Sequence, residues 1–171
     1  DSAGNLALSK DVNGTTVELQ SGGAISQTGG VLTAGTLTGS SVGSTTLNGA
    51  NQVGTLGNFT AANFALTNAQ SLSVSGTLNG GSSTALTTTA GDLAINGAVE
   101  GSTTTLKSAG VITESTGGSI AASTLTGQSG GATTLTGTNH INTLGSFSAA
   151  GFALTDAQAL SVNGSLNGGA S

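Results

Sequence analysis

The sequence lacks the residues from which most thick hydrophobic cores are built. Its 171 residues include no Trp, Tyr, Met or Cys, and only four Phe. The remaining Leu, Val, Ile and Ala can fill a narrow interior, but not one as wide as an ordinary sandwich or a doubly wound sheet. The absence of Cys also excludes a disulfide scaffold and zinc–thiolate sites, although it says nothing about the compartment.

Basic charge is almost as scarce. The sequence has two Lys, one His and no Arg, and its net charge is −5. This balance argues against a nucleic-acid partner, because nucleic-acid binding depends on basic contacts to phosphate. Only 5% of the residues are charged and 35% are apolar, which is not the composition of a disordered chain. No apolar run approaches the roughly 18 residues of a membrane span, and no basic-then-apolar signal peptide opens the chain.

What is present is a long internal repeat. Residues 31–83 return as residues 119–171, and 33 of these 53 positions are identical. The flanking segments repeat at an offset of 87 instead of 88, so one residue has been inserted near Ser115–Gly117. A fixed period of this kind indicates a repeat architecture. We expect one continuous domain over residues 1–171, made of two repeats, residues 1–87 and 88–171.

Short alternations of apolar and polar residues predict strands instead of helices. Gly, Thr, Ser and Asn are poor helix formers, and no stretch keeps a helical apolar stripe. The alternations place two apolar side chains on one face of a short strand: Leu6–Leu8, Val17–Leu19, Phe64–Leu66, Leu72–Val74, Leu93–Ile95 and Leu160–Val162. Asn-Gly pairs between them, such as Asn79-Gly80 and Asn96-Gly97, are expected at sharp corners with positive φ angles.

Apolar residues recur about every ten positions, and alternate ones are about 19 or 20 residues apart: Leu47, Leu66, Leu86, Leu106, Leu125 and Leu144. This is the length of one coil of a parallel β-solenoid, in which each coil stacks on the previous one. The absence of Pro fits, since a ladder needs most backbone donors. If equivalent residues are a whole number of coils apart, one repeat makes four long coils or five short ones. Eight to ten coils would form a rod roughly 40–50 Å long.

A pair of immunoglobulin-like domains is the rival architecture, because the period of the repeat is close to their usual size. Such sandwiches need longer alternating strands, a buried Trp and a Tyr corner. The chain has neither Trp nor Tyr. The spacing therefore favours an all-β, parallel β-solenoid with about 20 residues per coil.

The segment TLTG, then TTLNGANQVGTLGNFTAANFALTNAQSLSVSGTLNG and LTTTAGDLAINGAV, resembles the repeat region of filamentous haemagglutinin-like exoproteins. The resemblance covers nearly the whole chain in both repeats. It implies a right-handed parallel β-helix that forms the shaft of a large adhesin at the surface of a Gram-negative bacterium, exported through a partner pore in the outer membrane (two-partner secretion). The secretion domain of that family, with its Asn-Pro-Asn motifs, is not in this Pro-free sequence, and no toxin tip is visible.

The repeat also serves as a control for chemistry, because a site inherited by both repeats should keep its residue types. Instead, charged residues correspond to uncharged ones: Asp92 to Asn5, Asp156 to Asn68, Glu114 to Gln27, Lys107 to Gln20, Glu100 to Asn13, Glu18 to Thr105 and His140 to Gln52. Such exchanges suit solvated faces and not acid–base catalysis. We therefore predict no enzyme, no catalytic, cofactor-binding or metal site, and no cofactor. Lys10-Asp11 and Glu18 are interpreted as solubilising charge.

Lone His140 has no Cys or second His to form a metal site and is interpreted as a surface residue. The sequence has neither the clustered carboxylates and basic residue of β-helical polysaccharide lyases nor the calcium-binding Gly-Gly-x-Gly-x-Asp repeat.

Phe64 and Phe152 are predicted to be core. For Phe59 and Phe147 a core position is favoured over an exposed corner.

Thr-x-Thr pairs resemble those of ice-binding β-helices: Thr36-x-Thr38, Thr87-x-Thr89, Thr103-x-Thr105 and Thr124-x-Thr126. They are irregularly spaced, and Thr suits strands by its shape alone. A structural role for these Thr residues is therefore favoured, and a recognition module that binds glycan or ice through Thr and Asn ladders is the alternative function. The expected partners are neighbouring repeats, an outer-membrane transporter pore by resemblance, a surface or glycan receptor of unknown identity, and other copies that pair end to end through open solenoid edges.

Overall fold

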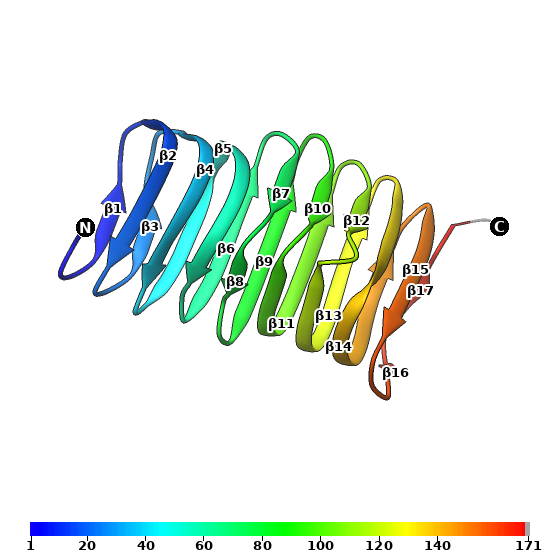
Figure 1. Cartoon of the computed structure of the whole chain (residues 1–171). Helices are drawn as coiled ribbons and strands as arrows, with labels where there is room; N and C mark the ends of the chain where they lie inside the picture. The colour runs from blue at the N-terminus through cyan, green and yellow to red at the C-terminus, as the bar shows by residue number, and fades with distance from the viewer. Residues whose placement is uncertain (170–171) are drawn as a thin grey trace.

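Parallel β-strands form the entire regular structure. The computed structural model describes residues 1–169, and every regular element in this range is a strand (Figure 1). The strands are β1 (Leu6–Leu8), β2 (Val12–Ser21), β3 (Ile25–Gln27), β4 (Leu32–Ser41), β5 (Ser44–Thr60), β6 (Asn63–Asn68), β7 (Leu72–Val74), β8 (Thr77–Asn79), β9 (Ser83–Thr88), β10 (Leu93–Ile95), β11 (Ala98–Ser108), β12 (Ile112–Glu114), β13 (Ser119–Ser129), β14 (Ala132–Ser148), β15 (Gly151–Asp156), β16 (Ser161–Val162) and β17 (Leu166–Asn167). Within residues 1–169 no helix is long and apolar enough to cross a membrane.

Each coil pairs with the coils before and after it, as predicted for a β-solenoid. One column of paired residues begins at Leu6 and passes through every coil in turn: Leu6, Ile25, Thr45, Phe64, Thr84, Thr104, Leu125, Leu144 and Val162. Eight steps of this column lead from Leu6 to Val162, so one turn takes about 20 residues. At about 4.8 Å per coil, eight turns are about 40 Å long.

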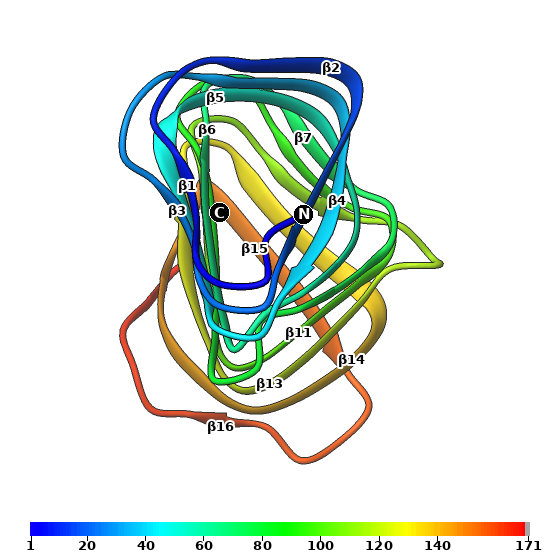
Figure 2. The same ribbon diagram turned by 90° about the vertical axis from the view of Figure 1, so that its left-hand side faces the viewer.

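The winding is right-handed. Figure 2 views the solenoid from the N-terminal end, and the chain runs clockwise as it recedes from the viewer. Backbone N–H and C=O groups of each coil bond to neighbouring coils along the axis, as in the pairing of β7 with both β5 and β10. The hydrogen bonds of the backbone are therefore satisfied without a second layer.

The core is the thin bore of the solenoid. In β7 and β10 the outer residues of Leu72–Val74 and Leu93–Ile95 are buried while the middle residue is only half-buried. This alternation follows from the pleat, which points successive side chains to opposite faces. The short strands expected from the apolar alternations are confirmed. The sequence did not predict the long continuous strands β5 and β14, each of 17 residues.

The two repeats do not occupy equivalent positions around the bore. One column of paired residues runs through Leu37, Leu56, Val74, Ile95 and Glu114. Thr113 pairs with Thr134, so the chain returns to this column next to Thr134, one coil after Glu114. Leu125, the equivalent of Leu37, lies about halfway along the coil between these two points. It belongs instead to the column that begins at Leu6. The second repeat is thus rotated by half a turn.

This rotation corrects two expectations. Equivalent residues are not a whole number of coils apart, and the expected leucine column is broken after its fourth member. Leu47, Leu66, Leu86 and Leu106 do stack, but Leu106 then pairs with Gly127 and not with Leu125. The physical reason is that coil length varies with the corners: the coil from Asn51 to its partner Asn68 is shorter than the coil from Leu72 to its partner Leu93.

The corners also differ from expectation. The positive-φ glycines of the described range are Gly30, Gly39, Gly81, Gly91 and Gly169, and none of them belongs to an Asn-Gly pair. Asn13-Gly14 and Asn48-Gly49 instead lie inside β2 and β5. At Gly30, with φ of 69°, an added Cβ would lie 2.2 Å from the Lys10 carbonyl carbon of the previous coil. Close approach between coils, as well as turn geometry, therefore requires glycine here.

Candidate functional site

A hydrogen-bonded network of polar side chains lies beside the bore at equivalent positions of the two repeats. In the first repeat, Gln27 at the end of β3 meets fully buried Asn51 of β5. The Gln27 Nε2 donates to Asn51 Oδ1 (2.8 Å) and to the Gly30 carbonyl (3.0 Å). The Gln27 Oε1 accepts from Asn51 Nδ2 and from the Gly49 N–H, both at 2.9 Å. Every donor and acceptor of the Gln27 amide group thus has a partner.

The second repeat places a carboxylate in the same network. Glu114 Oε2 accepts from Asn139 Nδ2 (2.9 Å) and from the Gly137 N–H (2.6 Å), which reproduces the contacts of Gln27 Oε1. The other oxygen, Oε1, is buried without a hydrogen-bond partner. It corresponds to the nitrogen that donates to an Asn oxygen and a backbone carbonyl in the first repeat. A carboxylate oxygen has no proton to donate there, so this contact is lost.

A second pair shows the same difference. Asn68 is fully buried, and its Nδ2 donates to the carbonyls of Val53 (2.9 Å) and Gln70 (3.0 Å). Its equivalent Asp156 keeps one bond, from the Ile141 N–H to Oδ1 (2.9 Å), while Oδ2 is buried without a partner. Both exchanges replace an amide donor with an acceptor.

These positions correct the expectation that the charged residues lie on solvated faces. Glu114 is only 8% exposed and Asp156 is half-buried. The expectation is confirmed for Lys10, Asp11, Glu18 and His140, which are exposed. The exchange with Gln27 singled out Glu114 in the sequence. Its position two residues after Ile112 places it on the inward face of the strand, and this alternation is the signal that could have indicated its burial.

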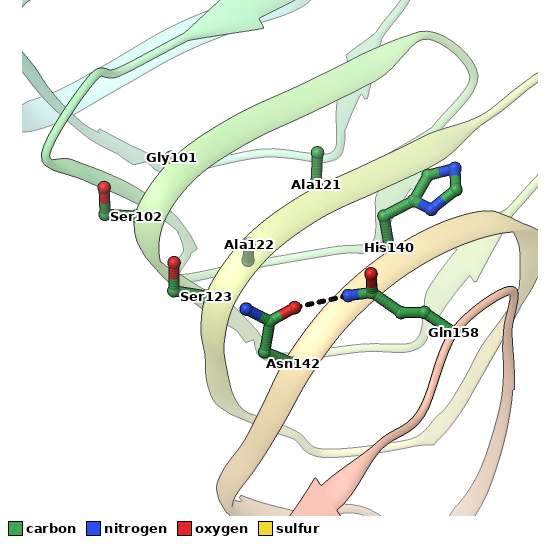
Figure 3. A pocket seen from close by; sticks show the side chains of 8 residues that line it. All are labelled: Gly101, Ser102, Ala121, Ala122, Ser123, His140, Asn142 and Gln158. Carbon is green, nitrogen blue, oxygen red and sulfur yellow. Dashed lines mark hydrogen bonds between the residues drawn. The ribbon is translucent and has the colours of Figure 1, made fainter.

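An open polar hollow lies in the second repeat, between β11, β13, β14 and the turn after β15 (Figure 3). Its lining residues are Gly101, Ser102, Ala121, Ala122, Ser123, His140, Asn142 and Gln158. The Gln158 side-chain amide is hydrogen-bonded to Asn142 Oδ1 across its floor. The lining carries short hydroxyl and amide groups and a single imidazole, which suit hydrogen bonding to a polar ligand and form no nucleophile–base pair.

The hollow is not a property of the repeat. Ser123 and Asn142 correspond to Gly35 and Gly54, and His140 to Gln52. Among the described residues, no group of three or more His, Cys, Asp or Glu is placed to hold a metal ion.

The Thr pairs form a small ladder. Thr103-x-Thr105 lies directly under Thr124-x-Thr126, and the hydroxyls of Thr105 and Thr126 are 3.1 Å apart and hydrogen-bonded. The ladder is more regular than the sequence spacing suggested, but it spans two coils. Below it, Thr103 and Thr105 pair with Ser83 and Ala85.

The phenylalanines lie mainly in the core. Phe59, Phe64 and Phe147 are 1% exposed, whereas Phe152, expected to be core, is half-buried. The rings of Phe59 and Phe64 pack edge to face with centroids 4.9 Å apart, and those of Phe147 and Phe152 lie at the same distance. The phenylalanines therefore stabilise the bore and are not placed for binding.

Comparisons with protein-family models, with curated proteins and with solved structures found no match to this chain. The class that the structure defines is the β-solenoid.

Proposed function

We propose that this chain is a non-catalytic section of a rigid shaft, belonging to a large exported bacterial surface protein of the filamentous haemagglutinin type. Its role is mechanical: stacked coils hold a distal functional region away from the cell. The adhesin type and the partner pore for export come from the sequence resemblance alone.

The observation that carries the proposal is the uninterrupted column of eight turns. Backbone bonds and side-chain ladders run along one axis from the first coil to the last, so the strands of each repeat join the same stack. Stability in such a stack comes from neighbouring coils, and repeats can be added without changing the cross-section. This arrangement suits a spacer better than a folded binding domain.

A tandem chain tests the shaft role. Two copies are joined by the segment that links the repeats here, Thr84–Thr87, and small-angle X-ray scattering compares the single and the doubled chain. We expect the maximum dimension to increase by about 40 Å, the length of eight coils. Two bodies that tumble independently would contradict the proposal.

The polar hollow supports a second candidate, a recognition surface for glycans. Ser123, His140 and Asn142 present hydroxyl, imidazole and amide groups, which suit sugar hydroxyls. A glycan array probed with the single chain separates the two functions. Binding that is lost in Asn142→Gly, which restores the residue of the first repeat, would favour recognition, and absence of binding favours the shaft.

A further inference from the structure

The last described coil exposes apolar side chains that the first repeat buries. Leu160, Val162 and Leu166 are 36%, 53% and 45% exposed. Their equivalents in the first repeat, Leu72, Val74 and Leu78, are at most 1% exposed. The sequence of the two segments is almost the same, so the difference lies in what covers them.

The coil that covers the first set is known from the structure. Strand β10 and the start of β11 pair with β7 and β8, which places Leu93 on Leu72, Ile95 on Val74 and Val99 on Leu78. The covering segment, residues 91–101, reads GDLAINGAVEG. At the last coil, β16 and β17 pair only with β14, so their other edges are open among the described residues.

The chain contains a second copy of the covering segment at its other edge. Residues 4–14 read GNLALSKDVNG, in which Leu6, Leu8 and Val12 stand where Leu93, Ile95 and Val99 stand in the inner copy. Here β1 pairs only with β3, and β2 only with β4. Apart from the bridge between Ser2 and Ser21, these strands have no partner on their other side among the described residues, and their apolar residues have the spacing that covers Leu72, Val74 and Leu78.

We propose that residues 160–167 of one chain bind residues 6–13 of a second copy of this chain. The contact reproduces the pairing of β10 and the start of β11 with β7 and β8: Leu160 meets Leu6, Val162 meets Leu8, and Leu166 meets Val12. Parallel ladder bonds and burial of three apolar side chains both stabilise it. The result is a head-to-tail stack of solenoids. The inference concerns the edges of the 171-residue chain, and in the proposed shaft a neighbouring repeat would occupy the same edges.

Lys10 and Asp11 weaken this contact. In the inner junction their equivalents are Gly97 and Ala98, and a Cβ at Gly97 would lie 2.2 Å from the Gly76 carbonyl oxygen. Lys10 must therefore displace the backbone at the same point of the stack. Charged residues on edge strands commonly limit such pairing. The stack is accordingly expected to be reversible, and to tighten when the inner sequence is restored.

The test measures self-association of the 171-residue chain by sedimentation velocity over a concentration series. Lys10→Gly with Asp11→Ala should tighten association at least tenfold. Val162→Lys, at an exposed position, should weaken it at least tenfold in both backgrounds. Val42→Lys is the matched control, because Val42 is 76% exposed and lies outside both edge segments, residues 6–13 and 160–167.

Circular dichroism and thermal melting of each variant confirm that the fold is kept. The proposal is overturned if the Lys10→Gly, Asp11→Ala chain remains monomeric at the highest concentration. It is also overturned if Val42→Lys changes association as much as Val162→Lys does. A loss of association confined to Val162→Lys supports it.

Discussion

The two repeats share 33 of 53 residues in their common segment, yet they differ in how their polar groups are satisfied. In the first repeat, the amides of Gln27 and Asn68 meet partners on both their oxygen and nitrogen atoms. In the second, Glu114 and Asp156 each leave one buried oxygen without a partner. The comparison shows that the solenoid keeps its fold when Asn or Gln is replaced by the corresponding acid. We expect the unpaired oxygen to lower the free energy of unfolding.

A second difference concerns position in the stack. Phe59 lies between Gly39 and Leu78 of the neighbouring coils, and all three are covered on both sides. Phe147 lies between Gly127 and Leu166, and Leu166 is 45% exposed. Substitution of the same residue should therefore lower the free energy of unfolding more in the middle of the solenoid than near its edge.

The largest expected effect comes from Phe59→Ala. The substitution leaves a cavity in a fully packed part of the bore and should lower the free energy of unfolding by about 3–5 kcal/mol. Phe147→Ala should cost less, because its neighbouring coil is partly open to solvent. Urea denaturation followed by circular dichroism measures both. Equal losses would show that the two clusters are packed alike.

Exchanging Gln27 and Glu114 tests the polar comparison directly. Gln27→Glu places an oxygen against the Gly30 carbonyl and Asn51 Oδ1, so it should lower the free energy of unfolding by about 2–3 kcal/mol. Glu114→Gln restores the donor and should raise it by about 1–2 kcal/mol. Gln52→Glu at an exposed position is the control for charge alone. A destabilised Glu114→Gln chain would refute this account of the network.

The Asn68 and Asp156 pair should behave in the same direction with smaller changes. Asn68→Asp removes the bonds to the Val53 and Gln70 carbonyls and should cost about 1–2 kcal/mol. Asp156→Asn should add up to about 1 kcal/mol, since Asp156 is half-buried and solvent partly screens its charge. Chemical denaturation of the two single variants and the double variant gives both values, and opposite signs from those stated here would contradict the comparison.

His140→Gln is expected to have the smallest effect. It restores the residue of the first repeat at an exposed position, so the free energy of unfolding should change by no more than about 0.5 kcal/mol. Zinc titration monitored by melting temperature provides a second readout, and neither chain should respond. A zinc-dependent shift confined to the parent chain would identify a ligand role for His140.

Much of the fold was predictable because its cause is local. Alternations such as Leu72–Val74 and Leu93–Ile95 point two apolar side chains inward, and their regular recurrence along the chain stacks them into a ladder. The absence of large aromatic residues limits the bore to one layer of such side chains. A core position for Phe59 and Phe147 was favoured over an exposed corner and is confirmed.

The candidate site was less predictable. The exchange of Gln27 for Glu114 was visible, but its interpretation as a solvated position was wrong. Strand β12 places Glu114 inward, in line with Ile95 of the coil before it. Glu114 stands two positions after Ile112 on the same strand, so the period of two could have placed it on the inward face, whereas its charge favoured a solvated position. The hollow at Ser123 and Asn142 likewise requires four coils in register.

The sequence by itself determined a slender parallel solenoid, because apolar spacing, small side chains and the absence of Pro act within one coil and its neighbours. Only the tertiary structure decided the half-turn between the repeats and the hydrogen-bond partners of Glu114 in the next coil. The reason is that coils of unequal length, such as the short one from Asn51 to Asn68 and the long one from Leu72 to Leu93, add up along the axis. The angular position of a distant residue is therefore the sum of every corner before it.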